Sequence, residues 1–438
     1  MSTWKRFLPK FATHAYHRTR ARLSTWRYRW PSCKLLVIGV TGTKGKSTTV
    51  AMLAHILTAL GERVAFSSTV QWGVAEATWP NRSKLTMPGR GALQKFLARA
   101  VRAGCTAVVL EVSSEGLAQA RHEGIVFDAA VLLNLTPEHI ESHGSFRKYR
   151  EAKEKLFASL NRTWRKTLHG KEIPTVIAAN ADDLHVFFFL RHAADRHVGF
   201  TTAGSDVKEV SGLAVLRATN ITCTPAQCTF MVNGVPGTVP LLGEYNVQNA
   251  LAALAVLHGL GYDLGKAVAA VAQFPGTPGR MEEVQLNAPF RVFVDYAHEP
   301  ASLQAAYAAV RLLKPKRLLT LLGSQGGGRD VAKRAVMGKL AAEHADVVVV
   351  TNEDPYDEDP DRIVADVAAG AEAVGKGQVI RITDRRQAIS RLLQLAQPGD
   401  VLLLTGKGGE QVMAVGGGRL IPWDDRAMIK AAYLQHQS

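Results

Sequence analysis

Cysteine is scarce in this chain, with four among 438 residues, and only Cys223 and Cys228 lie near each other in sequence. So few cysteines exclude the disulfide framework of a small secreted domain, and no second Cys/His pair nearby completes a zinc site. No apolar run approaches the roughly 18 residues of a membrane-spanning helix, and no apolar stretch follows the N-terminal charges as in a secretory signal. We therefore expect a reduced, cytoplasmic protein.

Acidic residues are absent from the first 61 positions, because the first one is Glu62. Residues 1–34 carry nine Lys or Arg, so only +6 of the net charge of +15 belongs to the other 404 residues. Mostly apolar positions recur there at roughly helical spacing, at Leu8, Phe11/Ala12, Ala15, Thr19, Leu23 and Trp26.

Two interpretations of this N-terminal extension stay open. One is an amphipathic helix on an anionic membrane surface, at the inner face of the membrane. The other is a helix packed on the body of the protein with solvated arginines. No nucleic acid is expected as a partner, because no supporting motif accompanies the basic residues.

Beyond residue 34 the composition is that of a globular protein, since apolar residues make up 47% and charged residues 21% of the chain. Its length is that of two or three domains. Apolar runs predict strands at Lys34–Val40, Ala107–Leu110, Ala129–Leu133, Val176–Ala179, Val347–Val350 and Val401–Leu404. Helical patterns lie between them at Ser47–Leu60, Ala92–Ala103, Phe146–Leu160 and Asn246–Gly259.

Residues 205–240 lack a helical period and predict a small antiparallel sheet. The Gly/Pro-rich stretch 274–279 separates two strand–helix series and is the best domain boundary. The pattern as a whole predicts an α/β protein with two parallel-type sheets in tandem.

Glycines punctuate the segment Gly39–Ser47, which follows the first predicted strand and opens a helix. In this setting backbone N–H groups can turn toward phosphate oxygens, and the helix N-terminus adds partial positive charge. Lys46 would neutralise phosphate charge, and the Ser47 hydroxyl would hold Mg²⁺. Val40 stands where the strict phosphate-loop pattern has glycine, so that pattern is only partly met.

Polar side chains follow two later strands. Glu111 ends one apolar strand, and the segment Asn134–Gly144 after another holds two acids and two histidines. Because strand carboxyl ends face the ligand crevice in α/β sheets, we expect these groups near a bound metal. The alternative for Glu111 is a surface acid that caps the next helix. Taken alone, Lys153 on the following helix would be solvent-facing.

The chain resembles the Mur ligases over about residues 35–430, through eight motifs in the same order. These are Gly39–Thr49, Glu111–Ser114, Asn134–Gly144, Tyr149–Lys153, Leu242–Asn249, Gly279–Glu282, Val294–Pro300 and Gly406–Glu410. The most similar branch adds the third residue of the peptidoglycan stem peptide. The resemblance implies an N-terminal extension (1–34), a phosphate-loop central domain with a mostly parallel sheet (35–277) and a Rossmann-like α/β C-terminal domain (278–438).

The resemblance implies an ATP-dependent amide ligase that adds an amino acid to a muramoyl-peptide-type acceptor in peptidoglycan precursor synthesis. ATP would phosphorylate an acceptor carboxylate, and the amine would attack the acyl phosphate. The positions that match ATP contacts are Gly42, Thr43, Lys44, Gly45, Lys46, Ser47, Thr48, Asn249, Arg280 and Asp295. Those that match ligands of two Mg²⁺ ions are Ser47, Glu111, His139 and a carbamylated Lys153, and the implied catalytic residues are Lys46, His139, Lys153 and Arg280.

The positions that match acceptor or amine contacts are Thr86, Ser113, Asp354, Tyr356, Gly406 and Glu410. The family's Asp-Asn-Pro-Arg is Glu353-Asp-Pro-Tyr356 here, so the arginine that grips the distal carboxylate of diaminopimelate is replaced. The nearby acids Glu353, Asp354, Asp357, Glu358 and Asp359 make this loop a candidate cation receptor. We therefore expect a lysine-like or other basic amine, with a merely solvated acidic loop as the alternative. Lys44 and Glu115 also depart from the family, which usually has Asn and His there.

The residues disfavour three other functions. A folylpolyglutamate- or cyanophycin-type ligase is disfavoured by Asp295–His298 together with Gly406–Gly408, which favour the muramoyl branch. A non-catalytic nucleotide-binding partner is disfavoured by the intact site positions, and a phosphate-loop kinase or switch GTPase leaves the second domain unexplained. The family's N-terminal UDP-binding domain has no counterpart in residues 1–34. We expect the UDP end to be bound elsewhere, or the acceptor to be another compound.

Overall fold

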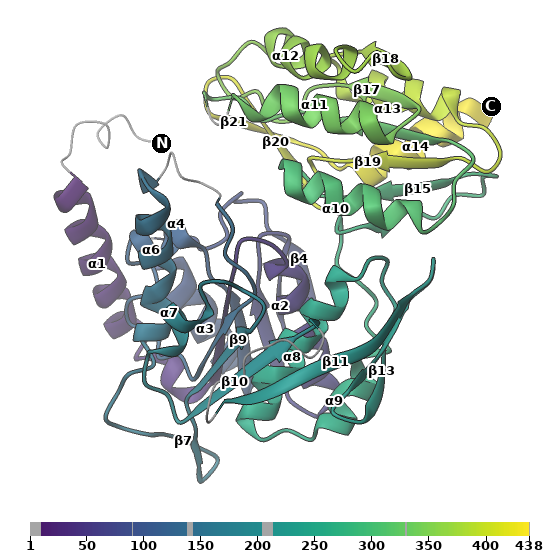
Figure 1. Cartoon of the computed structure of the whole chain (residues 1–438). Coiled ribbons are helices and arrows are strands. Elements are labelled where there is room, and N and C mark those ends of the chain that lie inside the picture. Colours follow the sequence, from purple (N-terminus) through teal and green to yellow (C-terminus); the bar gives the residue numbers. More distant parts are fainter. Residues whose placement is uncertain (1–9, 90, 138–142, 204–212, 329–330, 438) are drawn as a thin grey trace. The chain divides into compact units, whose positions relative to one another are not determined.

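The computed structural model describes residues 10–89, 91–137, 143–203, 213–328 and 331–437 (Figure 1). The chain divides into two compact units. Unit 1 comprises Met1–Thr222, Gln227–Pro240 and Glu244–Pro275, and unit 2 comprises Cys223–Ala226, Leu241–Gly243 and Gly276–Ser438. Both units consist of a mostly parallel sheet with helices, so the α/β fold class is confirmed.

Unit 1 is built on an eleven-stranded sheet in the order β13-β12-β11-β10-β9-β6-β1-β5-β2-β3-β4. Its strands are β1 (Leu36–Thr41), β2 (Val64–Ser67), β3 (Gln71–Val74), β4 (Ala77–Pro80), β5 (Ala107–Glu111), β6 (Ala129–Leu132), β9 (Val176–Asn180), β10 (Arg196–Thr201), β11 (Ala214–Cys223), β12 (Cys228–Val232) and β13 (Val235–Val239). A separate hairpin pairs β7 (Lys166–Leu168) with β8 (Lys171–Ile173). The helices are α1 (Lys10–Arg27), the 3₁₀ turn η2 (Pro31–Lys34), α2 (Lys46–Ala59), α3 (Ala92–Arg102), α4 (Ser114–Ala118), α6 (Phe146–Ala158), α7 (Val186–Leu190), α8 (Tyr245–Leu260) and α9 (Leu264–Val271).

The middle of this sheet is parallel, and its register positions the candidate site. β1 lies between β5 and β6, with Val40 opposite Glu111 and Thr41 opposite Leu132. All six residues of β1 are buried, as expected for a strand covered on both faces. The loops that follow these three strands therefore meet at one edge of the sheet.

Residues 205–240 were predicted to form a small antiparallel sheet; residues 205–212 lie outside the described residues, and the strands that follow form the edge of the main sheet, with antiparallel pairing between β12 and β13. β11 pairs in parallel with β10, while β12 and β13 form an antiparallel hairpin beyond it. Alternating burial along β12 is the pattern of a strand with one face covered. Lack of a helical period identified the strands but carried no information about their partners.

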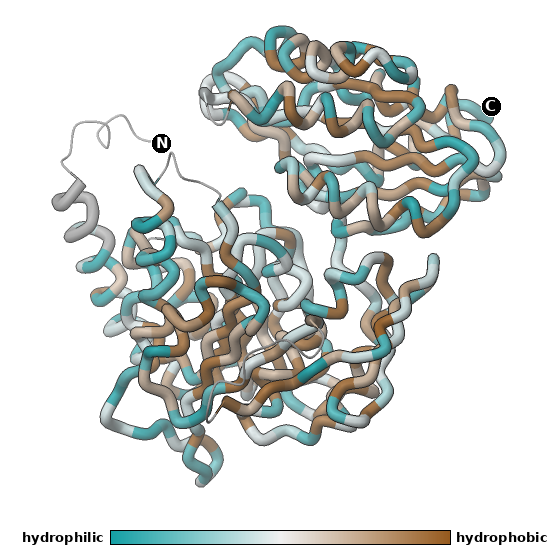
Figure 2. Tube along the Cα trace, viewed as in Figure 1, coloured by the Kyte–Doolittle hydropathy of each residue, from teal (hydrophilic) through white to brown (hydrophobic). Residues whose placement is uncertain are grey.

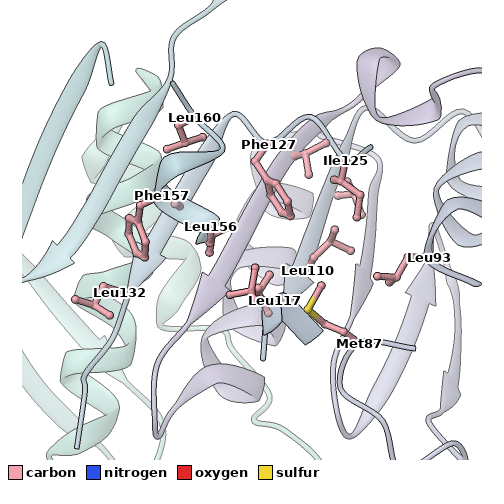
Figure 3. Close-up of a cluster of buried hydrophobic side chains, with 14 of the residues drawn as sticks. Met87, Leu93, Leu110, Leu117, Ile125, Phe127, Leu132, Leu156, Phe157 and Leu160 are labelled. Carbon is pink, nitrogen blue, oxygen red and sulfur yellow. The ribbon is translucent and has the colours of Figure 1, made fainter. Parts of the chain in front are cut away.

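A hydrophobic cluster on one face of the sheet joins α3, α6 and α7 to the central strands (Figure 3). Phe127 and Leu156 lie so close to Gly39 that a Cβ on that glycine would come within 2.9 Å of both side chains. The other face is covered by α2, α8 and α9. Figure 2 shows apolar residues concentrated along the strands, which is why short apolar runs predicted them well.

Unit 2 contains a six-stranded sheet in the order β14-β15-β19-β16-β17-β18, in which only β14 is antiparallel to its neighbour. The elements are β14 (Glu282–Glu283), β15 (Arg291–Val294), α10 (Pro300–Arg311), β16 (Leu318–Leu322), α11 (Lys333–His344), β17 (Val347–Val350), α12 (Pro360–Glu372), β18 (Gln378–Arg381), α13 (Arg385–Leu395), β19 (Val401–Leu404) and α14 (Asp425–Gln437). A hairpin of β20 (Val412–Val415) and β21 (Arg419–Pro422) lies outside this sheet. Helices α10, α11 and α12 cover one face of the sheet, and α13 and α14 cover the other.

Cys223 and Cys228 are disulfide-bonded, while Cys33 and Cys105 are thiols. The expectation of a fully reduced chain is therefore wrong for the first pair. Spacing alone did not show that β11 and β12 bring these positions together at the end of a hairpin. Across the described ranges, no helix combines the length and the apolar character needed to cross a bilayer.

A buried charge cluster holds the start of the chain to unit 1. The Lys166 ammonium lies 2.6 Å from Asp128 Oδ2 and within 3.0 Å of the carbonyl oxygens of Ser32, Leu35 and Val126. Arg162 donates to the other oxygen of Asp128 at 2.8 Å. Because Lys166 and Asp128 are almost fully buried, neither charge has water as an alternative partner.

Replacing Asp128 with Asn should lower the free energy of unfolding by about 3–5 kcal/mol, because it leaves the Lys166 ammonium buried without its counter-charge. The urea-unfolding transition measures this loss. Glu76→Gln is the control, since its partner Arg63 is half-exposed and the pair should contribute no more than about 0.5 kcal/mol. Equal effects of the two substitutions would contradict the role given to the buried cluster.

Candidate functional site

The phosphate loop runs from the end of β1 to the start of α2. Gly45 is the N-cap of α2 with φ 83°, a conformation that favours glycine. A Cβ at Gly45 would lie 2.3 Å from Asn249 Oδ1, and one at Gly42 would lie 2.8 Å from the Leu133 Cβ. Both glycines are thus required by close approach. Lys46, Ser47 and Thr48 follow in the first turn of the helix.

Asn134, two residues beyond β6, braces this loop. Its Oδ1 accepts hydrogen bonds from the backbone N–H groups of Thr43 at 3.1 Å and Lys44 at 2.8 Å. The Lys46 ammonium crosses the loop and donates to the Thr43 carbonyl oxygen at 2.8 Å. The loop is therefore held in a turned conformation by one side chain that follows β6 and one from the first turn of α2.

Glu111 links the start of α2 to the connection between β2 and β3. It is 2% exposed, and its Oε2 accepts from the Ser47 hydroxyl at 2.8 Å and from the Thr69 N–H at 2.7 Å. The Thr69 hydroxyl lies 3.0 Å from Glu111 Oε1 and 2.8 Å from the Thr86 hydroxyl. Thr69 thus connects Glu111, a predicted metal ligand, to Thr86, a predicted acceptor contact. The sequence analysis did not identify Thr69.

Lys153 extends from α6 into the interior and is 2% exposed. Its Nζ donates to the Gly42 carbonyl oxygen at 2.8 Å and lies 4.7 Å from the centre of the Tyr149 ring. The Tyr149 hydroxyl in turn lies 3.1 Å from Thr43 Oγ1. The solvent-facing alternative for this lysine is excluded, because it contacts the phosphate loop.

His139 lies outside the described residues, so its expected place beside the metal stays a prediction. The second histidine of that segment, His143, contacts the Ser114 hydroxyl through Nε2 at 3.1 Å. Ser113 is the N-cap of α4, and its hydroxyl accepts from the Gly116 N–H at 3.2 Å. These contacts place the serines that follow Glu111 next to the segment that follows β6.

Asn249, the predicted adenine contact, projects from α8 toward the phosphate loop. Its amide nitrogen donates to Asn246 Oδ1 at 3.1 Å, and its oxygen lies 3.4 Å from the Thr49 hydroxyl. The side chain therefore touches the loop and the first turns of α2 in unit 1.

The chemistry of this edge fits a nucleotide with a hard cation. The Ser47 hydroxyl and the Glu111 carboxylate supply oxygen donors at the N-terminus of a helix, which is the donor type that Mg²⁺ prefers. The glycine loop leaves backbone N–H groups close to the same helix end. Lys153 fits less directly, since an ammonium repels a metal ion until it is deprotonated or modified.

In unit 2, Arg280 and Asp295 come from the segment before β14 and the end of β15. The Arg280 guanidinium lies 4.2 Å from the centre of the Tyr296 ring. Asp295 accepts from the backbone N–H groups of Met281 at 2.7 Å and Ala297 at 2.8 Å. Burial raises the pKa of Asp295 despite the opposing effect of the nearby Arg280 charge.

Lys407 joins two of the predicted amine-site residues. Its buried ammonium donates to Asp354 Oδ1 at 3.0 Å, to Glu410 Oε2 at 2.7 Å and to the Val412 carbonyl oxygen at 2.8 Å. Asp354 also accepts from the Ala414 N–H at 2.7 Å. The sequence motif contained Lys407, but nothing in its spacing showed that it neutralises both acids.

Three further acids of the expected cation receptor also have hydrogen-bond partners within the chain. Arg334, 1% exposed, grips Glu358 with two hydrogen bonds of 2.7 and 2.9 Å, and this lowers the pKa of Glu358 to about 2. Asp357 accepts from the Gly417 N–H, and Asp359 caps α12. Asp357 and Asp359 are nevertheless exposed, so the loop as a cation receptor stays a prediction.

Glu353 is the exception in this loop. It is fully buried, and among the described residues neither carboxylate oxygen has a hydrogen-bond partner. A Cβ at Gly406 would lie 2.3 Å from Glu353 Oε2, so the carboxylate lies against another predicted amine-site position. The Ser324 hydroxyl and the Asn352 Oδ1 are likewise buried without a described partner at the ends of β16 and β17. An unsatisfied buried polar group is costly and often marks a functional site.

Tyr356 has φ 53°, which is uncommon for a residue with a side chain. Its ring packs over Gly327, where an added Cβ would be 3.6 Å from Cδ2, and its N–H donates to the Ala414 carbonyl oxygen. The residue therefore lies between the glycine-rich loop after β16 and the β20–β21 hairpin.

A glycine loop of this construction, with a hydroxyl and a carboxylate at the start of the following helix, defines unit 1 as a phosphate-loop nucleotide-binding domain. The family profile described as "Mur ligase middle domain" matches residues 40–257, and that described as "Mur ligase, glutamate ligase domain" matches residues 279–408. The chain belongs to the Mur ligase family, and it is an ATP-dependent ligase that forms carbon–nitrogen bonds.

Individual relatives agree with this assignment. The chain is 37% identical over 421 residues to a UDP-N-acetylmuramyl-tripeptide synthetase of Roseiflexus sp., covering 94% of this chain and 81% of that protein. It is 38% identical over 420 residues to a UDP-N-acetylmuramoyl-L-alanyl-D-glutamate--2,6-diaminopimelate ligase of Nostoc sp., covering 94% and 79%. A solved structure with the latter name is 29% identical, with a TM-score of 0.62 and coverage of 96% of this chain and 84% of that chain.

Stability should depend on pH through Glu353, because burial and then the adjacent Asp354 raise the pKa of Glu353 from 4.5 to about 7. Between these values the folded chain binds a proton that the unfolded chain has lost. Stability is therefore full below pH 4.5 and falls as the pH rises through 7, by about 3 kcal/mol in total.

Unfolding of the Glu353→Gln variant, followed across this pH window, should lack that loss. Glu358→Gln is the matched control, because folded Glu358 stays ionised over the same window. A Glu353→Gln variant with the pH dependence of the unmodified protein would show that Glu353 is ionised throughout.

Proposed function

We propose that this ligase adds an amino acid to a muramoyl-peptide acceptor in peptidoglycan precursor synthesis. The observation that carries the proposal is the site in unit 1 together with relatives named for this chemistry. The acceptor carboxylate attacks the terminal phosphorus of ATP and ADP leaves. The amine then attacks the acyl carbon, phosphate leaves, and the amine gives up a proton as the amide forms.

The phosphate loop would bind ATP through its backbone N–H groups, with Lys46 neutralising phosphate charge and Asn249 contacting the base. Lys46 now donates to Thr43, and this bond would be exchanged for one to phosphate. Arg280 and Asp295 of unit 2 are the proposed contacts to the phosphates and the ribose. Thr86 and Ser113 are proposed for the acceptor, near the carboxylate of Glu111.

Two Mg²⁺ ions are part of the proposal. Ser47 would hold one of them, and Glu111, His139 and Lys153 would hold the other. Bound Mg²⁺ would supply charge neutralisation on the phosphates. Carbamylation of Lys153 would replace a buried cation with an anion, and a carbamate keeps one N–H on the nitrogen that now donates to Gly42.

The amine is proposed to be a basic amino acid with a single distal ammonium group. Tyr356 cannot form the bidentate contact to a second carboxylate that an arginine provides. Asp354 and Glu410 are matched by Lys407, which leaves the Glu353 carboxylate as the charge that an ammonium group would pair with. The relatives named as diaminopimelate ligases act on a different amine by name.

We also propose that the protein is cytoplasmic and associates peripherally with the inner face of the membrane through residues 1–34. The support is electrostatic, because this segment carries nine Lys or Arg and no acid.

The first test is phosphate release from Mg-ATP with UDP-muramoyl-dipeptide and a panel of lysine, ornithine, diaminopimelate and alanine. Release should require the acceptor and a basic amine, and mass spectrometry should detect the amide. Glu353→Gln should lower kcat/KM for lysine by about 10- to 100-fold without changing the KM for ATP, because a charged hydrogen bond is lost. Asp357→Asn is the matched control.

Faster ligation of diaminopimelate than of lysine would refute the assignment of the amine. An absence of stimulation by any amine would favour a non-catalytic partner or a different acceptor.

Carbamylation predicts that Lys153 carries a CO₂ adduct in intact-mass spectra recorded with bicarbonate present. Lys153→Ala should lower kcat at least about 100-fold, and short carboxylic acids should restore part of the activity. Lys155→Ala on the exposed side of the same helix should have no effect. An unmodified Lys153 in a fully active enzyme would overturn the proposal.

A further inference from the structure

The N-terminal helix α1 lies against the rest of unit 1, next to α3 (Figure 1), and buries small side chains there. Ala21 is 9% and Thr25 3% exposed. A Cβ on Gly124 would lie 1.9 Å from the Thr25 hydroxyl oxygen, so this glycine allows the helix to approach. Arg18 and Arg22 reach Glu123 at 3.3 and 3.6 Å. The expectation of a helix packed on the body is thus met, but not through its apolar stripe.

The opposite face of α1 carries the large apolar side chains. Leu23 is 60% and Trp26 is 70% exposed, at a spacing of three residues. Tyr16, two helical turns before Leu23, is 41% exposed. Trp30, just beyond the helix, is 49% exposed. Tyr16, Leu23 and Trp26 are called here the outer face of α1, and Leu23 and Trp26 belong to the helical stripe seen in the sequence. Clustered exposed aromatics of this kind mark an interaction surface.

Basic side chains border the outer face. Arg20 follows Tyr16 by one turn, with its guanidinium 5.5 Å from the ring centre, and Arg27 follows Leu23 by one turn. Arg22 is 62% exposed although it reaches Glu123. No acidic residue occurs before Glu62, so no carboxylate of α1 opposes the approach of a negative surface.

We infer that the outer face of α1 lies on an anionic phospholipid bilayer while the helix stays packed on unit 1. This inference rests on the proposed membrane association and names the side chains that make it. Aromatic rings with a flanking row of arginines match the boundary between acyl chains and anionic headgroups.

The test is cosedimentation of the full chain with vesicles of equal parts phosphatidylglycerol and phosphatidylcholine, compared with pure phosphatidylcholine. The unmodified protein should bind the anionic vesicles and be released by salt. Leu23→Ala/Trp26→Ala should weaken binding by at least about tenfold, because two buried apolar side chains are lost. Trp164→Ala/Leu184→Ala is the matched control, since it removes side chains that are 48% and 94% exposed elsewhere in unit 1.

Circular dichroism and the ligation assay in solution show whether each variant is folded and active. Deletion of residues 2–30 tests the association as such. If the deletion abolishes vesicle binding but Leu23→Ala/Trp26→Ala leaves it unchanged, the N-terminal extension binds the membrane through residues other than the outer face, and the inference is wrong. If the unmodified protein ignores anionic vesicles, the membrane is the wrong partner, while ligation would still be judged by product formation.

Discussion

The hydrogen bonds that converge on the Glu111 carboxylate are the interaction on which the nucleotide end of unit 1 depends. They connect three elements that are distant in sequence: the first turn of α2 through Ser47, the β2–β3 connection through Thr69, and the end of β5. Charge-assisted bonds of this kind are strong when they are buried. The phosphate loop, the metal donors and the acceptor-side Thr86 are therefore all connected through Glu111.

The central strands and the position of Glu111 were largely predictable from the sequence. Runs of valine and leucine gave β17 and β19 with their observed limits, because fully buried strands leave an uninterrupted apolar signal. The glycines around Lys46 located the phosphate loop, and a carboxylate at the end of β5 had to face the same edge as that loop. Pairing partners were not predictable, since apolar runs carry no register. The edge position of β11–β13 is an example.

Side-chain partners at the second site were not predictable either. The acids between Glu353 and Asp359 look equivalent in sequence, yet Arg334 and Lys407 neutralise some of them, and these basic residues are about 20 and 50 positions away. What remains is one buried carboxylate beside Gly406. Sequence composition thus indicated an acidic loop, whereas the folded unit distinguishes a buried carboxylate, Glu353, from the exposed Asp357 and Asp359. Likewise, helical spacing found the apolar stripe of α1 but not which face would dock.

The Lys166 cluster has a mechanical consequence. Its ammonium grips the carbonyl oxygens of Ser32 and Leu35, which lie between α1 and the strand that leads into the phosphate loop. A force applied to α1 would thus act on the buried Lys166–Asp128 ion pair before it reached β1. The cluster thus fixes the connection between α1 and β1 to the interior of unit 1.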